Sequence, residues 1–122
     1  MIISVGDTNI TFTGYNHPLK KAFKKGLLPN VRHGLYGYPI DKNNVSLEHG
    51  DPVCLGGLTE SSNLFLAERG ANSRRGIRPL EEVVTKSMMA EYLVQFIGVK
   101  NYLVNGQKYI DAVMKRWWSK LR

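Results

Sequence analysis

The pattern of apolar and polar positions changes along the chain, from short alternating runs to helical spacing in the last third. Two β-rich runs, at residues 2–5 and 10–13, flank the turn-forming residues 6–9 and predict a hairpin. Pro18 suits the first turn of a short helix that Gly26 would end. The next residues, up to position 44, are rich in Gly, Pro and Asn and predict a loop.

The middle of the chain predicts two short strands followed by a helix. Residues 45–49 alternate between apolar and polar side chains, and residues 64–66 form a second apolar run. The segment 50–62 contains glycines, a proline and several polar residues, which favours a compact Ω-type excursion. Residues 67–75 then predict a short helix that Gly76 stops.

The last third of the chain predicts two packing helices. Pro79 suits a helix start, and a broad apolar face extends over residues 80–97. Asn105 is a good N-cap for a final helix, whose apolar positions recur at i, i+3, i+4 and i+7. We therefore expect one α+β domain, with an N-terminal part (1–44), a strand–loop–strand–helix centre (45–78) and a helical C-terminal part (79–122).

Composition and charge point to a folded protein with a polyanionic partner. Of the 122 residues, 43% are hydrophobic and 22% charged, and the net charge of +7 favours nucleic acid or an acidic surface. The most basic patch is the predicted first helix, where the lysines either contact phosphate or form a solvated helix face. These lysines are Lys20, Lys21, Lys24 and Lys25.

Cysteine content and hydropathy indicate where the protein works. Cys54 is the single cysteine, so the sequence predicts neither an internal disulfide nor a zinc ribbon built on paired Cys-x-x-Cys ligands. No apolar run is long enough to span a membrane, and the N-terminal residues do not resemble a signal peptide. A cytoplasmic protein is the expectation, in the host cytoplasm if a phage encodes it.

A set of polar residues at fixed intervals carries the functional signal. Glu48-His49 ends the first central strand and is followed by a Pro and a Gly-Gly pair. Asn63 lies 14 positions after His49, directly before a leucine, and Asn72 lies 23 positions after His49 in the predicted helix. In order and spacing this set resembles the HNH, or ββα-metal, endonuclease family of phages and mobile elements. The resemblance covers residues 45–78.

The resemblance implies a role for each residue. Glu48 and Asn72 would offer oxygen ligands to one hard cation, Mg²⁺ or Mn²⁺. His49 would be the general base that deprotonates the attacking water, and the cation would neutralise charge at the cleaved phosphodiester. Asn63 would belong to the catalytic set only indirectly, by tying down the loop or fixing the His49 ring. A single site of this kind would nick DNA as a monomer, leaving a 5′ phosphate, whereas cutting both strands would need a homodimer.

DNA contacts are expected mainly on phosphates, from the four lysines and from Arg74, Arg75 and Arg78. The Gly50-Asp51 pair departs from the two apolar residues of many relatives and adds a carboxylate near the site. The Asp51 side chain would either point to solvent or perturb the bound cation.

Other functions stay open at this point. The chain could be a silent HNH-fold module that holds nucleic acid without cutting, or a host-directed inhibitor that binds a protein partner. The C-terminal pair Trp117-Trp118 is the one candidate for an exposed apolar patch or base-stacking surface, although its spacing favours a core position. His17 and His33 lie outside the motif and are expected in loops.

Overall fold

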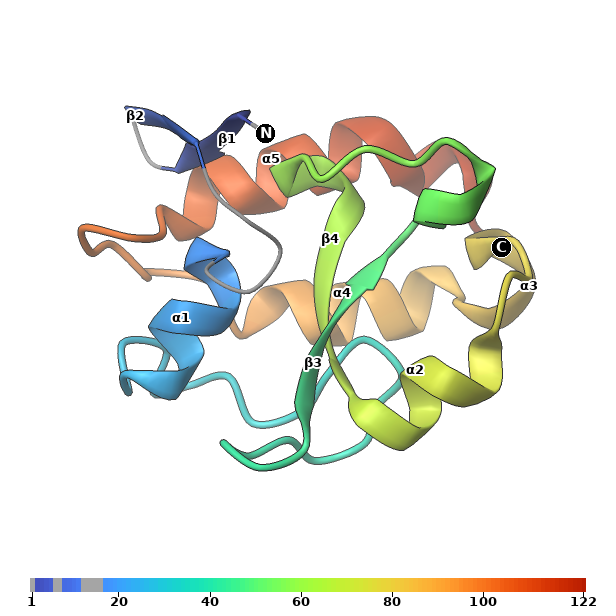
Figure 1. Cartoon of the computed structure of the whole chain (residues 1–122), viewed down its shortest axis with the longest axis horizontal. Coiled ribbons are helices and arrows are strands. Elements are labelled where there is room, and N and C mark those ends of the chain that lie inside the picture. Colours follow the sequence, from blue (N-terminus) through green and yellow to red (C-terminus); the bar gives the residue numbers. More distant parts are fainter. Residues whose placement is uncertain (1, 6–7, 12–16) are drawn as a thin grey trace.

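The computed structural model describes residues 2–5, 8–11 and 17–122, and this part of the chain is α+β (Figure 1). The N-terminal hairpin is present, with β1 (Ile2–Val5) antiparallel to β2 (Thr8–Thr11). The second strand begins at Thr8, two residues earlier than the sequence pattern predicts. The remainder of that predicted hairpin, at residues 6–7 and 12–13, lies outside the described residues.

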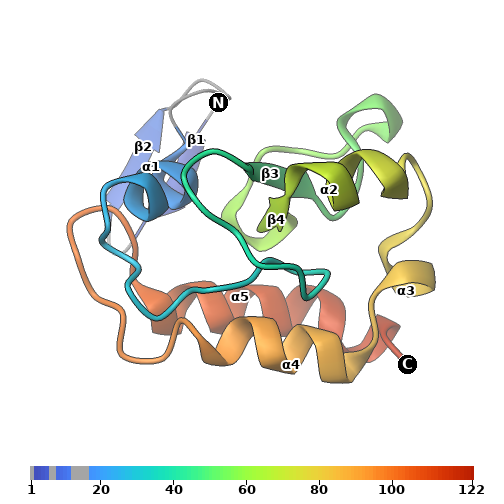
Figure 2. The same cartoon turned by 90° about the horizontal axis from the view of Figure 1, so that it is seen from below.

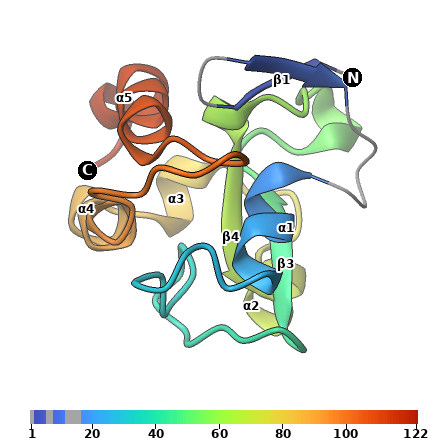
Figure 3. The ribbon, with the colours of Figure 1, turned by 90° about the vertical axis from the view of Figure 1, so that its left-hand side faces the viewer.

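The centre of the molecule is a second antiparallel hairpin, β3 (Val45–His49) and β4 (Leu64–Glu68). Helix α1 (Pro18–Lys24) lies on one face of this hairpin and α2 (Arg69–Arg75) on the opposite face (Figures 2 and 3). The strand β4 continues to Glu68, whose carboxylate accepts hydrogen bonds from the backbone N–H groups of Gly70 and Ala71. This cap starts α2 at residue 69 rather than at the expected residue 67, because it satisfies N–H groups that have no partner within the helix.

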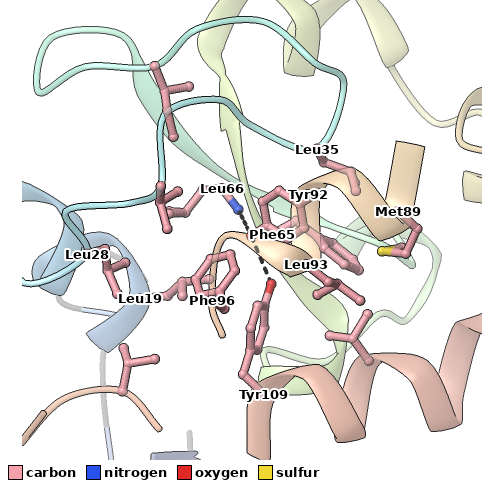
Figure 4. Close-up of a cluster of buried hydrophobic side chains, with 14 of the residues drawn as sticks. Leu19, Leu28, Leu35, Phe65, Leu66, Met89, Tyr92, Leu93, Phe96 and Tyr109 are labelled. Carbon is pink, nitrogen blue, oxygen red and sulfur yellow. Dashed lines mark hydrogen bonds between the residues drawn. The ribbon is translucent and has the colours of Figure 1, made fainter. Parts of the chain in front are cut away.

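The outer edge of β4 is covered by helices α4 (Lys86–Val94) and α5 (Gly106–Trp117). The Tyr92 hydroxyl accepts from the Leu66 N–H at 2.9 Å and lies 2.9 Å from the Tyr109 hydroxyl (Figure 4). The Tyr109 hydroxyl in turn donates to the Leu64 carbonyl at 2.6 Å. The Leu35 N–H donates to the Leu66 carbonyl at 2.8 Å. Buried side chains and a loop therefore supply the hydrogen bonds that a third strand would have made.

The helical third differs from the sequence expectation in one place. The apolar stretch 80–97 forms two helices, α3 (Leu80–Val83) and α4, with extended backbone at Val84 between them. The Thr85 hydroxyl accepts from the Met88 N–H and starts α4 afresh, since a side-chain acceptor at an N-cap competes with continuing the preceding helix. The C-terminal part thus holds three α-helices instead of the expected two, followed by the short η4 (Trp118–Lys120).

The core forms around Phe65, whose ring packs edge-on against Tyr92 and Trp117 at centroid distances of 5.9 and 6.4 Å. The Trp117 side chain is buried, so the core interpretation is right for this residue and it presents no face to a base. Trp118 is half-buried on the α4–α5 side. Among the described residues, no helix has the length and apolar character needed to cross a membrane.

Candidate metal and phosphate site

Glu48 points from β3 toward the face that α2 covers, and its carboxylate is buried. Its Oε2 accepts from the Tyr36 hydroxyl at 2.6 Å, and its Oε1 lies 3.3 Å from Nη1 of Arg75. Burial raises the pKa of Glu48, while the Tyr36 hydrogen bond and the Arg75 charge oppose that rise. The carboxylate is therefore compensated by a buried cation and a phenol within the protein itself.

Arg75 occupies a different place from the one expected of a phosphate contact. Its side chain is 1% exposed and donates to three backbone carbonyls, those of His49 at 2.7 Å, Gly50 at 2.6 Å and Arg78 at 2.8 Å. Of the three carbonyls that this guanidinium binds, two lie at the end of β3 and one lies just after α2. The expectation that Arg75 grips DNA from the surface is corrected: the residue fastens α2 to the strand end.

Asn72 lies one turn earlier on α2 and is half-buried over β3. Its amide nitrogen donates to the Ser46 hydroxyl at 3.0 Å and to the Leu47 carbonyl at 3.1 Å. A carbonyl can only accept, so the Leu47 contact fixes which end of the amide faces the strand. The Asn72 oxygen consequently turns away from β3 and keeps its lone pairs for another partner.

His49 faces the opposite side of the hairpin, because neighbouring strand residues alternate between faces. Its Nε2 lies 3.2 Å from the Thr59 hydroxyl, and burial lowers the pKa of the His49 ring. His17, expected in a loop, is a buried N-cap of α1 whose Nδ1 accepts from the Leu19 N–H at 3.1 Å. Burial and then the nearby His49 lower the pKa of His17 to about 4.

Within the described part of the chain, no hydrogen bond or ion pair joins the side chains of Glu48, His49 and Asn72 to one another. The structure brings Glu48 and Asn72 to the α2 face of the hairpin and places His49 on the α1 face. Glu48 and His49 lie at the end of β3, and Asn72 lies on α2, the helix that packs beside this strand.

The donors on the α2 face fit a hard cation in their chemistry. A carboxylate offers about four lone-pair sites, of which Tyr36 and Arg75 engage one on each oxygen of Glu48. With the Asn72 oxygen, this leaves oxygen ligands of the kind that Mg²⁺ or Mn²⁺ takes while keeping most of its water. Among the described residues, no three or more His, Cys, Asp or Glu side chains are placed so that together they could hold a metal ion.

The loop between the strands is held by Asn63, which is completely buried. Its Oδ1 accepts from the Asp51 N–H at 2.6 Å, and its Nδ2 donates to the carbonyls of Asp51 and Leu58 at 3.1 and 2.8 Å. Anchoring of the loop is one of the two roles expected of Asn63, and fixing of the His49 ring is the other. The anchored loop carries Thr59, whose hydroxyl lies 3.2 Å from Nε2 of His49, so Asn63 also supports this contact.

The Gly50-Asp51 departure has a packing reason. A Cβ at Gly50 would lie 2.4 Å from the ring of Trp117, so only glycine lets α5 approach the strand end. The Asp51 carboxylate binds Nη2 of Arg116 on α5 at 2.6 Å, rather than pointing freely to solvent or toward the candidate cation. The same guanidinium contacts Glu60 at 3.4 Å, so α5 clamps both ends of the loop.

The predicted phosphate contacts divide into two surfaces. Of the α1 lysines, Lys20 is half-buried, and burial and the charge of Lys24 lower its pKa; the other three are exposed. Arg74, in the last turn of α2, and Arg78, which follows that helix, are exposed and line a groove of about 360 Å³. The further residues around this groove are Tyr36, Tyr38, Ala71, Arg75, Glu82, Val83 and Met88.

Sequence reasoning missed Tyr36, Thr59 and Arg116, which hold Glu48, His49 and the loop respectively. Tyr36 comes from the segment 27–44, which has no periodicity that would assign it to a face. The helical spacing of the last segment puts Arg116 on or beside the polar side of α5, but nothing local indicates which loop its side chain contacts.

Comparison with known proteins gives no relative of this chain: no protein-family model matches it, and neither the curated proteins nor the solved structures contain a significant match.

Proposed function

We propose that this protein is a divalent-metal-dependent endonuclease of the HNH type, which hydrolyses a DNA phosphodiester at the end of β3. The observation that carries the proposal is the combination of motif and topology. The intervals from His49 to Asn63 and Asn72 are those of the family, and the same residues fall on a strand–loop–strand–helix unit.

In this proposal Glu48 and Asn72 hold Mg²⁺ or Mn²⁺ through their oxygens. The bound cation would neutralise charge on the phosphate and the leaving oxygen. Arg75 keeps the backbone of His49 and Gly50 in place through its bonds to both carbonyls. Thr59 holds Nε2 of His49 at 3.2 Å and would set the direction of the ring. His49 lies on the other face of the hairpin, so in this proposal the scissile phosphate would lie across the end of β3, between His49 and the cation. His49 would then accept the proton of the attacking water, a step that typically contributes about 10²–10⁴ in rate.

A second function is favoured by one contact. The buried Arg75 lies 3.3 Å from Glu48, and a cation in that position disfavours a second cation on the same carboxylate. If the ion pair persists with DNA bound, the protein would be a nucleic-acid-binding module of the same topology that does not cut. Binding to phosphate would then depend on the surface cations alone.

Nicking of supercoiled plasmid, measured with Mg²⁺, with Mn²⁺ and with EDTA, separates these functions. The nuclease proposal predicts open-circular product with either metal and none in EDTA. His49→Ala should lower the rate by about 10²–10⁴ while DNA affinity stays near that of the wild type. The matched control is His33→Ala, because His33 lies outside the site and meets Gln95 through its backbone.

Two results would overturn the nuclease proposal. One is equal nicking by the wild type and His49→Ala, which would assign the activity to a contaminant or another residue. The other is DNA binding with no metal-dependent nicking, which supports the silent module. Elemental analysis should find no stoichiometric zinc, and one tightly held zinc per chain would contradict the proposed ligands.

A further inference from the structure

The groove beside Glu48 combines arginines with an exposed aromatic ring. Arg74 comes from α2, Arg78 from the segment that follows α2, and Tyr38 from the segment between α1 and β3. Tyr38 is half exposed, and the guanidinium of Arg74 lies 5.5 Å from the centre of its ring. An aromatic face bordered by cations is the arrangement by which proteins hold single-stranded nucleic acid, with bases stacked on rings and phosphates on cations.

The turn that carries Tyr38 is fixed to the central hairpin. The Gly34 N–H donates to the Tyr38 carbonyl at 3.0 Å, and Gly37, at φ +86°, donates to the Gly34 carbonyl at 3.0 Å. A Cβ at Gly34 would lie 2.6 Å from Cα of Ala67, so the turn sits directly against β4. Two residues away from Tyr38, the Tyr36 hydroxyl binds Glu48. The exposed ring is therefore presented at a defined position next to the candidate site, which lowers the entropy lost when a base stacks on it.

We propose that Tyr38 is a stacking platform for an unpaired base and that Arg74 and Arg78 bind the adjoining phosphates. In a duplex each base face is covered by its neighbours, so only an unpaired or extruded base can stack on a protein ring. The preferred nucleic acid is then single-stranded or locally unpaired DNA. The inference rests on the proposed function only in naming that DNA as the substrate; the binding itself does not require cleavage.

Fluorescence anisotropy in EDTA, with a short labelled oligothymidylate and a duplex of equal length, tests this without any cutting. Tyr38→Leu should weaken binding to the single strand by about fivefold to hundredfold and leave duplex binding unchanged. Tyr38→Phe, which keeps the ring, should bind like the wild type. Tyr102→Leu is the matched control, because Tyr102 is the more exposed tyrosine and lies outside the groove, where its hydroxyl binds Lys25 just after α1.

Salt dependence separates stacking from phosphate contact. Tyr38→Leu should leave the slope of log affinity against log salt unchanged, whereas Arg74→Ala and Arg78→Ala should each reduce the slope by up to about 1. The inference is wrong if Tyr38→Leu binds the single strand as tightly as the wild type, or if Tyr102→Leu loses as much affinity. Single-strand binding that depends on Tyr38, without nicking, would refute the nuclease proposal and support the stacking proposal. Nicking with single-strand binding that does not depend on Tyr38 would support the nuclease proposal and refute the stacking proposal.

Discussion

Replacing Asn63 by alanine should destabilise the protein by about 3 kcal/mol, because three hydrogen bonds lose one partner each. An unsatisfied buried group costs about 1–3 kcal/mol. The lower end applies here, since Asp51 is only half-buried and Leu58 is exposed, so water reaches part of the freed backbone. Urea unfolding should show a lower midpoint with an unchanged m-value.

Asn63→Asp tests the hydrogen-bond reasoning more sharply, since it keeps the shape and the acceptor. At neutral pH it places a carboxylate oxygen against the carbonyls of Asp51 and Leu58, where the amide donated. This variant should be at least as unstable as Asn63→Ala. Asn43→Ala, in an exposed turn, is the control and should change stability by no more than about 0.5 kcal/mol. An Asn63→Asp protein as stable as the wild type would refute the account of the loop.

Three further perturbations follow from the contacts. For His17, a folded pKa of about 4 against 6.5 unfolded means that the unfolded chain binds the extra proton, so stability falls as the pH drops from 6.5 toward 4. Between pH 7 and pH 4, the free energy of unfolding should fall by about 3 kcal/mol more for the wild type than for His17→Asn, which keeps an N-cap acceptor. An equal fall in both proteins would contradict this reasoning. Replacing Lys24 and Lys25 by alanine should reduce the salt slope of DNA binding by up to about 2 if both contact phosphate, and by nothing if they form a solvated helix face. Arg75→Ala leaves Glu48 without its cation and should cost about 3–5 kcal/mol in urea unfolding, whereas the exposed Arg78→Ala should cost far less; similar values for the two would mean that Arg75 is not the fastener described.

Local sequence signals predicted the elements that bring the candidate residues near β3. Alternation over residues 45–49, the loop composition of 50–62 and the Gly76 stop were enough to place the strands and α2, and Asn105 caps α5 as expected. These features depend on a few neighbouring residues, whose periodicity and caps are visible in the sequence.

The misses concern contacts between distant segments. Arg74, Arg75 and Arg78 look alike in sequence, yet only Arg75 points under the end of β3, where it meets Glu48. The break at Val84 does have a local signal, because Thr85 is a good N-cap. The broad apolar face over residues 80–97 nevertheless favoured one continuous helix in the prediction. Which arginine becomes buried depends on how α2 packs against β3, and the residue spacing within α2 does not predict that packing.

The two tyrosines that bond the outer edge of β4 have a consequence for self-association. A two-stranded ribbon has two open edges, and exposed edges are templates on which further strands, including those of other copies, can add. Here Tyr92, Tyr109 and Leu35 already occupy the N–H of Leu66 and the carbonyls of Leu64 and Leu66. A neighbouring chain would have to displace buried hydroxyls and part α4 and α5 from the core before it could pair there. The two hydroxyls and the Leu35 N–H that cover the outer edge of β4 thereby also oppose β-type aggregation at that edge.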